Sequence, residues 1–143
     1  MLDIYPSLSL ILRYIYCLVF QGASSLNVVD VNPPLRNHHS AITINFRDKS
    51  YSPEKGGYHP VEIRLINSGD TWYFDYVTDF GYVGVVYPEL EKTLDFSWTD
   101  GYAWAAFAGD LPDADGIELY KLWQQNFVAY WITGVFTTSV CWE

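Results

Sequence analysis

The chain has 143 residues, half of them hydrophobic and 18% aromatic, and 17 acidic against 8 basic side chains give a formal net charge of −9. This length predicts one domain, and a composition so rich in apolar side chains excludes an intrinsically disordered chain. The acidic excess argues against direct nucleic-acid binding, because neutralising phosphates requires clustered lysine and arginine.

The charge is unevenly distributed along the chain. Residues 1–69 carry six basic and five acidic side chains, a balance of +1, whereas residues 70–143 carry twelve acidic side chains against Lys92 and Lys121, a balance of −10. Such asymmetry bears on association and solubility. Two interpretations stay open: an acidic face that binds a basic partner, or a solvated surface that keeps an aromatic-rich protein soluble.

Residues 1–35 are predicted to be an N-terminal apolar segment and connector, followed by one domain at 36–143. The apolar run at 8–20, interrupted by Arg13, is too short to span a membrane as a helix. It is either an N-terminal helix that packs on the domain or a secretory signal, for which Ala23 and Ser25 offer a cleavage pattern. Because no basic residue precedes the run, we expect a cytoplasmic protein, with export as the alternative. Residues 27–40 are predicted to be an extended connector.

Four segments alternate between apolar and polar residues, as half-buried strands do. They cover residues 41–47, 61–66, 72–80 and 94–98. In the third, the alternation predicts Trp72, Phe74, Tyr76 and Phe80 on one face and Tyr73, Asp75 and Asp79 on the other. Turn residues at 67–70 and 99–101 separate neighbouring segments, so we expect an antiparallel meander.

The C-terminal part changes to helical spacing. Six apolar residues recur at intervals of three and four and predict one buried helix stripe within residues 116–133: Leu119, Leu122, Trp123, Phe127, Tyr130 and Trp131. Asp113 and Asp115 are expected to cap the start of this helix, and Gly134 to close its end. Residues 135–143 are predicted to be a short edge strand. The fold class is therefore α+β: a twisted antiparallel sheet with the C-terminal helix packed on one face.

No metal, cofactor or catalytic site is predicted. Residues 113–116 resemble part of a calcium loop, but Leu111 and Leu122 stand where ligands are needed. His38, His39 and His59 lack metal-ligand spacing, and Cys17 and Cys141 form neither a metal pair nor a disulfide scaffold.

The segment 51–60 is longer than a usual hairpin connection and carries the candidate partner-binding residues Tyr51, Glu54, Tyr58 and His59. It is either a self-packed surface loop or a functional one, and we expect it to matter more to function than to stability. Asp75 and Asp79 are candidates on an acidic sheet face, where carboxylates at this spacing are expected to be solvated.

Residues 45–65 (NFRDKSYSPEKGGYHPVEIRL) resemble the signature of a bacterial family of uncharacterised proteins often encoded on pathogenicity islands and other mobile elements. Segments 72–80, 90–96 and 119–127 add further matches, and the resemblance covers about residues 41–134. It implies a fold like that of the mitochondrial acidic matrix glycoprotein that binds complement globular heads, a twisted antiparallel sheet with helices on one side in proteins that form acidic ring-like oligomers. No catalytic residues are established for the family, so none is carried over.

Three functions are compatible with these observations. The first is a non-enzymatic, acidic interaction module that self-associates through its aromatic helix and binds a protein partner through the acidic face or the 51–60 loop. The second is a small enzyme that uses His59 with Glu54 or Asp48 as acid and base. The third is an acidic decoy that mimics nucleic acid. The first is favoured because no catalytic constellation is recognisable.

Overall fold

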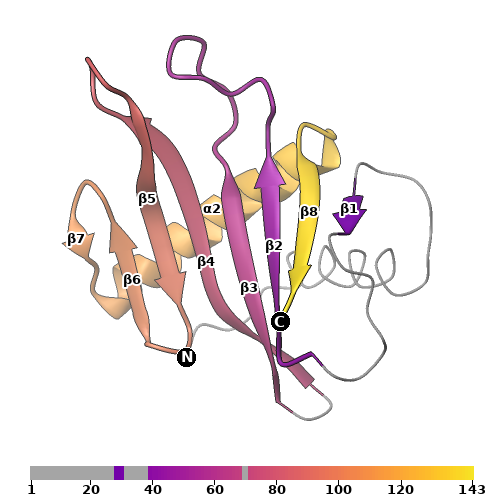
Figure 1. Ribbon diagram of the computed structural model, residues 1–143. Helices are drawn as coiled ribbons and strands as arrows, with labels where there is room; N and C mark the ends of the chain where they lie inside the picture. The colour runs from indigo at the N-terminus through magenta and orange to yellow at the C-terminus, as the bar shows by residue number, and fades with distance from the viewer. Residues whose placement is uncertain (1–27, 31–38, 69–70) are drawn as a thin grey trace.

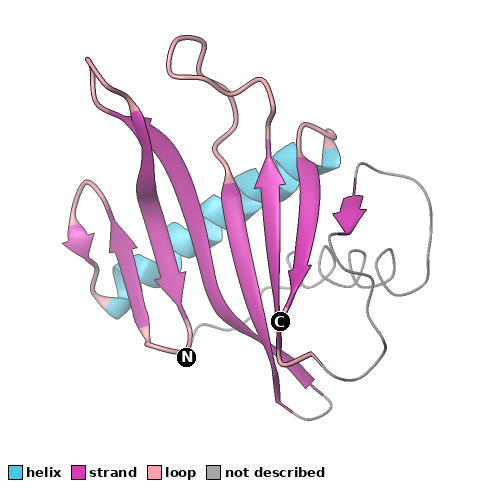
Figure 2. Ribbon diagram, in the orientation of Figure 1, coloured by secondary structure: helices cyan, strands magenta, loops and turns pink. Residues whose placement is uncertain are grey.

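The computed structural model describes residues 28–30, 39–68 and 71–143, in which eight strands form one sheet and one helix crosses a face of it (Figure 1). The strands are β1 (Val28–Asp30), β2 (Ala41–Arg47), β3 (Val61–Ser68), β4 (Thr71–Val83), β5 (Glu89–Ser97), β6 (Tyr102–Ala105), β7 (Gly109–Asp110) and β8 (Thr137–Trp142). The helix, α2, spans Asp113–Ile132. Figure 2 shows this helix lying diagonally behind the strands, which confirms the α+β class.

The strand order is β1-β8-β2-β3-β4-β5-β6-β7, so the antiparallel meander is confirmed from β2 to β7. The prediction of an edge strand at 135–143 is wrong, because β8 pairs antiparallel with β2 on one side and parallel with β1 on the other. Part of the predicted connector, residues 28–30, is strand β1. The predicted N-terminal helix or signal lies outside the described residues.

The core lies between the sheet and α2. The predicted inward faces of β2 and β3 are confirmed, since their alternate apolar side chains are buried: Ile42, Ile44, Phe46, Val61, Ile63 and Leu65. From the helix side, Trp123 stacks nearly parallel on Phe127 with ring centroids 5.1 Å apart, and Phe127 meets Phe46 edge to face. Burying each large apolar side chain contributes about 1.5–3 kcal/mol, so these rings hold the helix on the sheet.

A β-bulge at Asp75 changes which residues of β4 face the helix. Arg64 pairs with Tyr76 while Leu65 pairs with Phe74, so Asp75 is the extra residue. One extra residue exchanges the two faces of the strand beyond it. The predicted common face for Phe74 and Tyr76 is therefore wrong, and so is the common solvent face for Asp75 and Asp79.

Helix α2 buries most of the predicted stripe but not all of it, with Leu119 and Trp131 partly buried against the core. Trp123 and Phe127 are buried as predicted, but Leu122 is 58% exposed and Tyr120, expected outside the stripe, is completely buried. Asp113 and Asp115 lie in the first turn rather than before it and make no side-chain cap, although their charges suit the helix dipole. Gly134, with φ +77°, closes the end as predicted. Within the described residues, no helix is both long and apolar enough to cross a bilayer.

Candidate functional site

The loop between β2 and β3, which carries the predicted site residues, is packed against its own domain. The Asp48 carboxylate accepts hydrogen bonds from the backbone N–H groups of Ser50 and Tyr58 and from the Ser50 hydroxyl. These bonds hold the pKa of Asp48 below its usual value, with the Ser50 side chain as the main cause. The ring of Tyr58 packs on Tyr130 at 4.7 Å. Of the predicted residues on this loop, Glu54 is exposed near its tip, and Tyr58 and the His59 side chain remain 37% and 45% exposed.

Tyr51 and His59 join this loop to β4. The Tyr51 hydroxyl accepts a hydrogen bond from the backbone N–H of Tyr82, and the Tyr51 ring lies 5.5 Å from that of His59. The His59 ring sits over Gly81, where an added Cβ would come within 3.1 Å of it. Glycine at position 81 therefore lets the histidine lie close to the strand.

His59 Nδ1 lies 2.7 Å from Asp79 Oδ1, and this hydrogen bond raises the pKa of His59 more than burial lowers it. Asp79, only 9% exposed, also accepts hydrogen bonds from the Thr93 hydroxyl and the Trp123 indole. The predicted acid/base partners Glu54 and Asp48 are thus wrong, since Asp79 takes that place. The Asp79 carboxylate thus has partners in the β2–β3 loop, on β5 and on α2. We call these four residues the loop cluster, and it cross-links the loop, the sheet and the helix.

Asp75 lies on the outer face of the sheet, opposite α2. Its carboxylate pairs with Arg64, whose guanidinium also binds the Glu143 carboxylate at 2.6 Å. The predicted site residues therefore do not form one site: Asp75 belongs to the outer face, and His59 and Asp79 to the loop cluster.

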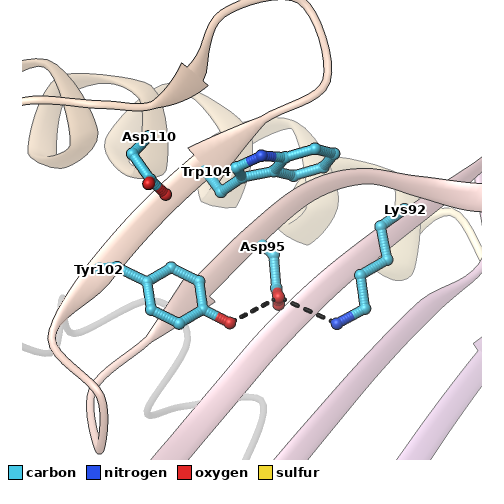
Figure 3. A pocket seen from close by; sticks show the side chains of 5 residues that line it. All are labelled: Lys92, Asp95, Tyr102, Trp104 and Asp110. Atoms are coloured by element: carbon cyan, nitrogen blue, oxygen red, sulfur yellow. Dashed lines mark hydrogen bonds and ion pairs between the residues drawn. The ribbon is translucent and has the colours of Figure 1, made fainter.

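A pocket that was not predicted opens on the outer face at the β5–β7 end of the sheet (Figure 3). It has a volume of about 280 Å³ and is lined by Lys92, Asp95, Tyr102, Trp104 and Asp110. We call it the Asp95 pocket. Its floor is Asp95, only 5% exposed.

Three donors satisfy the Asp95 carboxylate: the Thr78 hydroxyl at 2.7 Å, the Tyr102 hydroxyl at 2.8 Å and Lys92 Nζ at 3.0 Å. Burial, followed by the bond to Asp95, raises the pKa of Tyr102 to about 12, so this phenol remains a donor at neutral pH. The Asp95 carboxylate at the floor of the pocket is therefore held in place by three hydrogen bonds, and its charge is compensated by Lys92.

Strand register explains why these side chains meet. Trp104 pairs with Asp95 on β5 and with Asp110 on β7, so an indole stands between two carboxylates in one cross-strand row. Directly paired residues place their side chains on the same face. The turn at 99–101 indicates that β5 and β6 form a hairpin and so sets the pairing of Asp95 with Trp104. The pairing of Trp104 with Asp110 depends on a second turn, between β6 and β7.

A second unpredicted feature is the tip of the β4–β5 hairpin, residues 84–88, which projects beyond the sheet at the upper left of Figure 1. Val85, Val86 and Tyr87 are 98%, 77% and 85% exposed. Gly84, with φ +105°, shapes the turn, where a Cβ would lie 2.9 Å from the Tyr87 carbonyl oxygen. The available signal was an apolar run, Val-Val-Tyr, placed where a turn between strands is usually polar.

The described residues contain no group of three or more His, Cys, Asp or Glu side chains that could hold a metal ion. His39 packs on Trp142, with ring centroids 5.2 Å apart. Cys141 is exposed and unbonded to sulfur within the described part of the chain.

A family model described as "Protein of unknown function (DUF2787)" matches residues 23–141. The chain belongs to this family. A solved structure of a hypothetical protein from the VSP-II pathogenicity island of Vibrio cholerae is 32% identical to this chain with a TM-score of 0.76, and the match covers 96% of this chain and 93% of that one. No curated protein matches the chain.

A second structure comes from the pathogenicity island VPI-2 of Vibrio cholerae and is described as a conserved hypothetical protein that shares structural homology with the human P32 protein. It is 38% identical to this chain, with a TM-score of 0.75 over 97% of this chain and 95% of that one. These matches confirm the expected family of uncharacterised proteins and its expected likeness to the P32 fold.

Proposed function

We propose that this DUF2787 protein is a non-enzymatic protein-interaction module whose main docking element is the tip of the β4–β5 hairpin. The observation that carries the proposal is the exposure of Val85, Val86 and Tyr87 together at a projecting turn. Contiguous exposed apolar side chains are typical of interaction sites. Burying one of them in an interface contributes about 1.5–3 kcal/mol, so three neighbours make an effective anchor.

The charges beside the tip indicate the kind of partner. Glu89 and Glu91 follow the tip on β5 and are exposed, and the C-terminal half of the chain has a balance of −10. We therefore expect a protein with an apolar groove rimmed by lysine or arginine. An anionic lipid surface fits less well, because the two carboxylates would be repelled by it.

Site-specific photo-cross-linking tests this docking element. A photoreactive residue at position 86 should capture a protein through a peptide that is apolar and flanked by basic residues. The same residue at position 73, where Tyr73 on β4 is 50% exposed away from the tip, is the matched control. Equal capture at both positions, or capture of lipid alone at position 86, would overturn the proposal.

The affinity for the captured and purified partner then measures how much the exposed tip residues contribute to binding. Replacing Val85, Val86 and Tyr87 by serine should weaken binding at least about tenfold, as expected from losing roughly 1.4 kcal/mol or more of apolar burial. Tyr73→Ser removes an exposed apolar side chain elsewhere on β4 and should leave affinity unchanged. Displacement of the partner by duplex DNA would favour the decoy function instead.

Self-association is the other part of the proposal. Tyr120 cannot support it, because this side chain is buried, but Leu122 and Ile132 leave apolar surface exposed on α2. We expect a homo-oligomer at micromolar concentration, measured by light scattering, and a strict monomer would refute it. We also infer a cytoplasmic location, which cell fractionation tests.

A further inference from the structure

The Asp95 pocket holds an aromatic ring and a free carboxylate side by side. Asp110 makes no hydrogen bond or ion pair with the described residues, whereas Asp95 is saturated by Thr78, Tyr102 and Lys92. The row of side chains across β5, β6 and β7 places the Trp104 indole next to Asp110, and Figure 3 shows both at the rim of the open space.

The charged groups around this space leave a net negative charge. Lys92 is compensated by Asp95 at 3.0 Å, and Asp110 remains as the uncompensated charge of the pocket wall. Asp100 is a further nearby carboxylate, since it acts on the Tyr102 phenol together with Asp110. A cationic ligand therefore gains attraction here, and an anion is repelled.

We propose that the Asp95 pocket binds the guanidinium group of an arginine side chain, stacked on Trp104 and paired with Asp110. A guanidinium is flat, can stack on an indole and presents paired N–H donors to a carboxylate, whereas a lysine ammonium lacks the planar face. The pocket volume of about 280 Å³ suits a side-chain group rather than a large cofactor.

The claim that the arginine belongs to a protein partner rests on the proposed function. The claim that the pocket binds a guanidinium group does not. The pocket and the tip both involve β5, where Lys92 and Asp95 lie a few residues beyond the tip. At about 3.3 Å per residue, the eight positions from Tyr87 to Asp95 span roughly 26 Å. A basic segment of a partner seated on the tip can therefore reach the pocket along the strand.

Titration with N-acetyl-arginine amide tests the site directly. The side-chain indole N–H resonance of Trp104, assigned by its absence in Trp104→Phe, should shift in a saturable way. N-acetyl-citrulline amide has the same shape without the charge and should shift it little. Asp110→Asn should weaken arginine binding about fivefold, as expected for one charge-assisted contact at a partly exposed site. Glu54→Gln, which removes a carboxylate in the β2–β3 loop, is the control and should change nothing.

Equal binding of the citrulline compound, an unshifted Trp104 resonance, or unchanged affinity in Asp110→Asn would each overturn the proposal. Folding of each variant is checked by the remaining indole resonances, which should stay at their wild-type positions. Failure here leaves the hairpin-tip cross-linking result unaffected. Conversely, if cross-linking at position 86 captures no protein, the pocket can still bind arginine, but that arginine is no longer assigned to a protein partner.

Discussion

The indole N–H of Trp123 donates a hydrogen bond to Asp79 Oδ2 at 2.9 Å and so joins α2 to β4 across 44 residues of sequence. The same carboxylate accepts from the Thr93 hydroxyl on β5 and contacts His59 in the β2–β3 loop. Four parts of the domain therefore depend on one side chain.

Asp79→Ala should lower the free energy of unfolding by about 1–3 kcal/mol, because it leaves the buried Trp123 N–H without its acceptor. The Thr93 hydroxyl keeps a second acceptor, the backbone carbonyl of Asp79 at 3.0 Å. Asp79→Asn keeps the shape and one acceptor oxygen, so its loss should be smaller. Urea denaturation measures both. Asp115→Ala, an exposed carboxylate in the first turn of α2, is the control. An Asp79→Ala protein as stable as this control would contradict the cross-linking role.

Stability should also depend on the ionisation of His59. Its hydrogen bond with Asp79 raises its pKa above the ordinary 6.5. A histidine whose pKa is higher in the folded state stabilises the fold fully below the unfolded pKa, and this contribution is lost as the pH rises through the folded pKa. The free energy of unfolding of wild type minus that of His59→Gln should therefore be larger at about pH 5.5 than at about pH 8.5. A difference that is constant over this range would show that ionisation of His59 adds nothing.

Gly116→Ala should destabilise the protein, although alanine in a helix usually gains about 0.5–1 kcal/mol over glycine. A Cβ at this position would lie 2.6 Å from Ala103 Cβ on β6, so α2 must move away from the sheet. We expect a loss of about 1–3 kcal/mol, as for other overpacked sites. Adding Ala103→Gly should recover part of it, measured as a favourable coupling in a double-mutant cycle. Additive effects of the two changes would rule out the contact as the cause.

Gly56 and Gly57 are neighbours in the β2–β3 loop, with φ +69° and +134° respectively. Both have positive φ, but a Cβ at Gly57 would lie 2.8 Å from Asp48 Oδ2, whereas at Gly56 it would meet open space. Both alanine variants carry backbone strain of about 1 kcal/mol or more. Gly57→Ala should melt at a clearly lower temperature than Gly56→Ala, because its Cβ displaces the Asp48 carboxylate and its φ of +134° suits alanine less than +69° does. Equal melting temperatures would show that the Asp48 bonds do not hold the loop.

The predicted strands matched the structure where alternation was unbroken, as in β2, whose bounds agree at both ends. The bulge at Asp75 had no such signal, since it is an unpaired residue relative to β3 and only the register reveals it. It turned Asp79 towards Trp123, and the partner of His59 could not be predicted because strand register is a tertiary property.

The buried face of α2 was mispredicted in part, and for a related reason. Apolar spacing favoured Leu122, which is exposed. Gly116 allows close approach to Ala103, and the buried line runs through Tyr120, Trp123 and Phe127. The Asp95 pocket was missed because its residues lie on three strands whose alignment depends on two consecutive turns. Composition identified the acidic half of the chain, but it did not show which carboxylate lacks a partner.

The position of β8 has a consequence for how the domain assembles. Ile42 on β2 is aligned with Trp142 on β8, a separation of 100 residues. Contacts between segments so distant must overcome the entropy of closing a long loop and are expected to slow folding. Until β8 arrives, one side of β2 presents unpaired backbone groups, which are a template for pairing with another chain. Productive folding is therefore in competition with aggregation until β8 covers that side of β2.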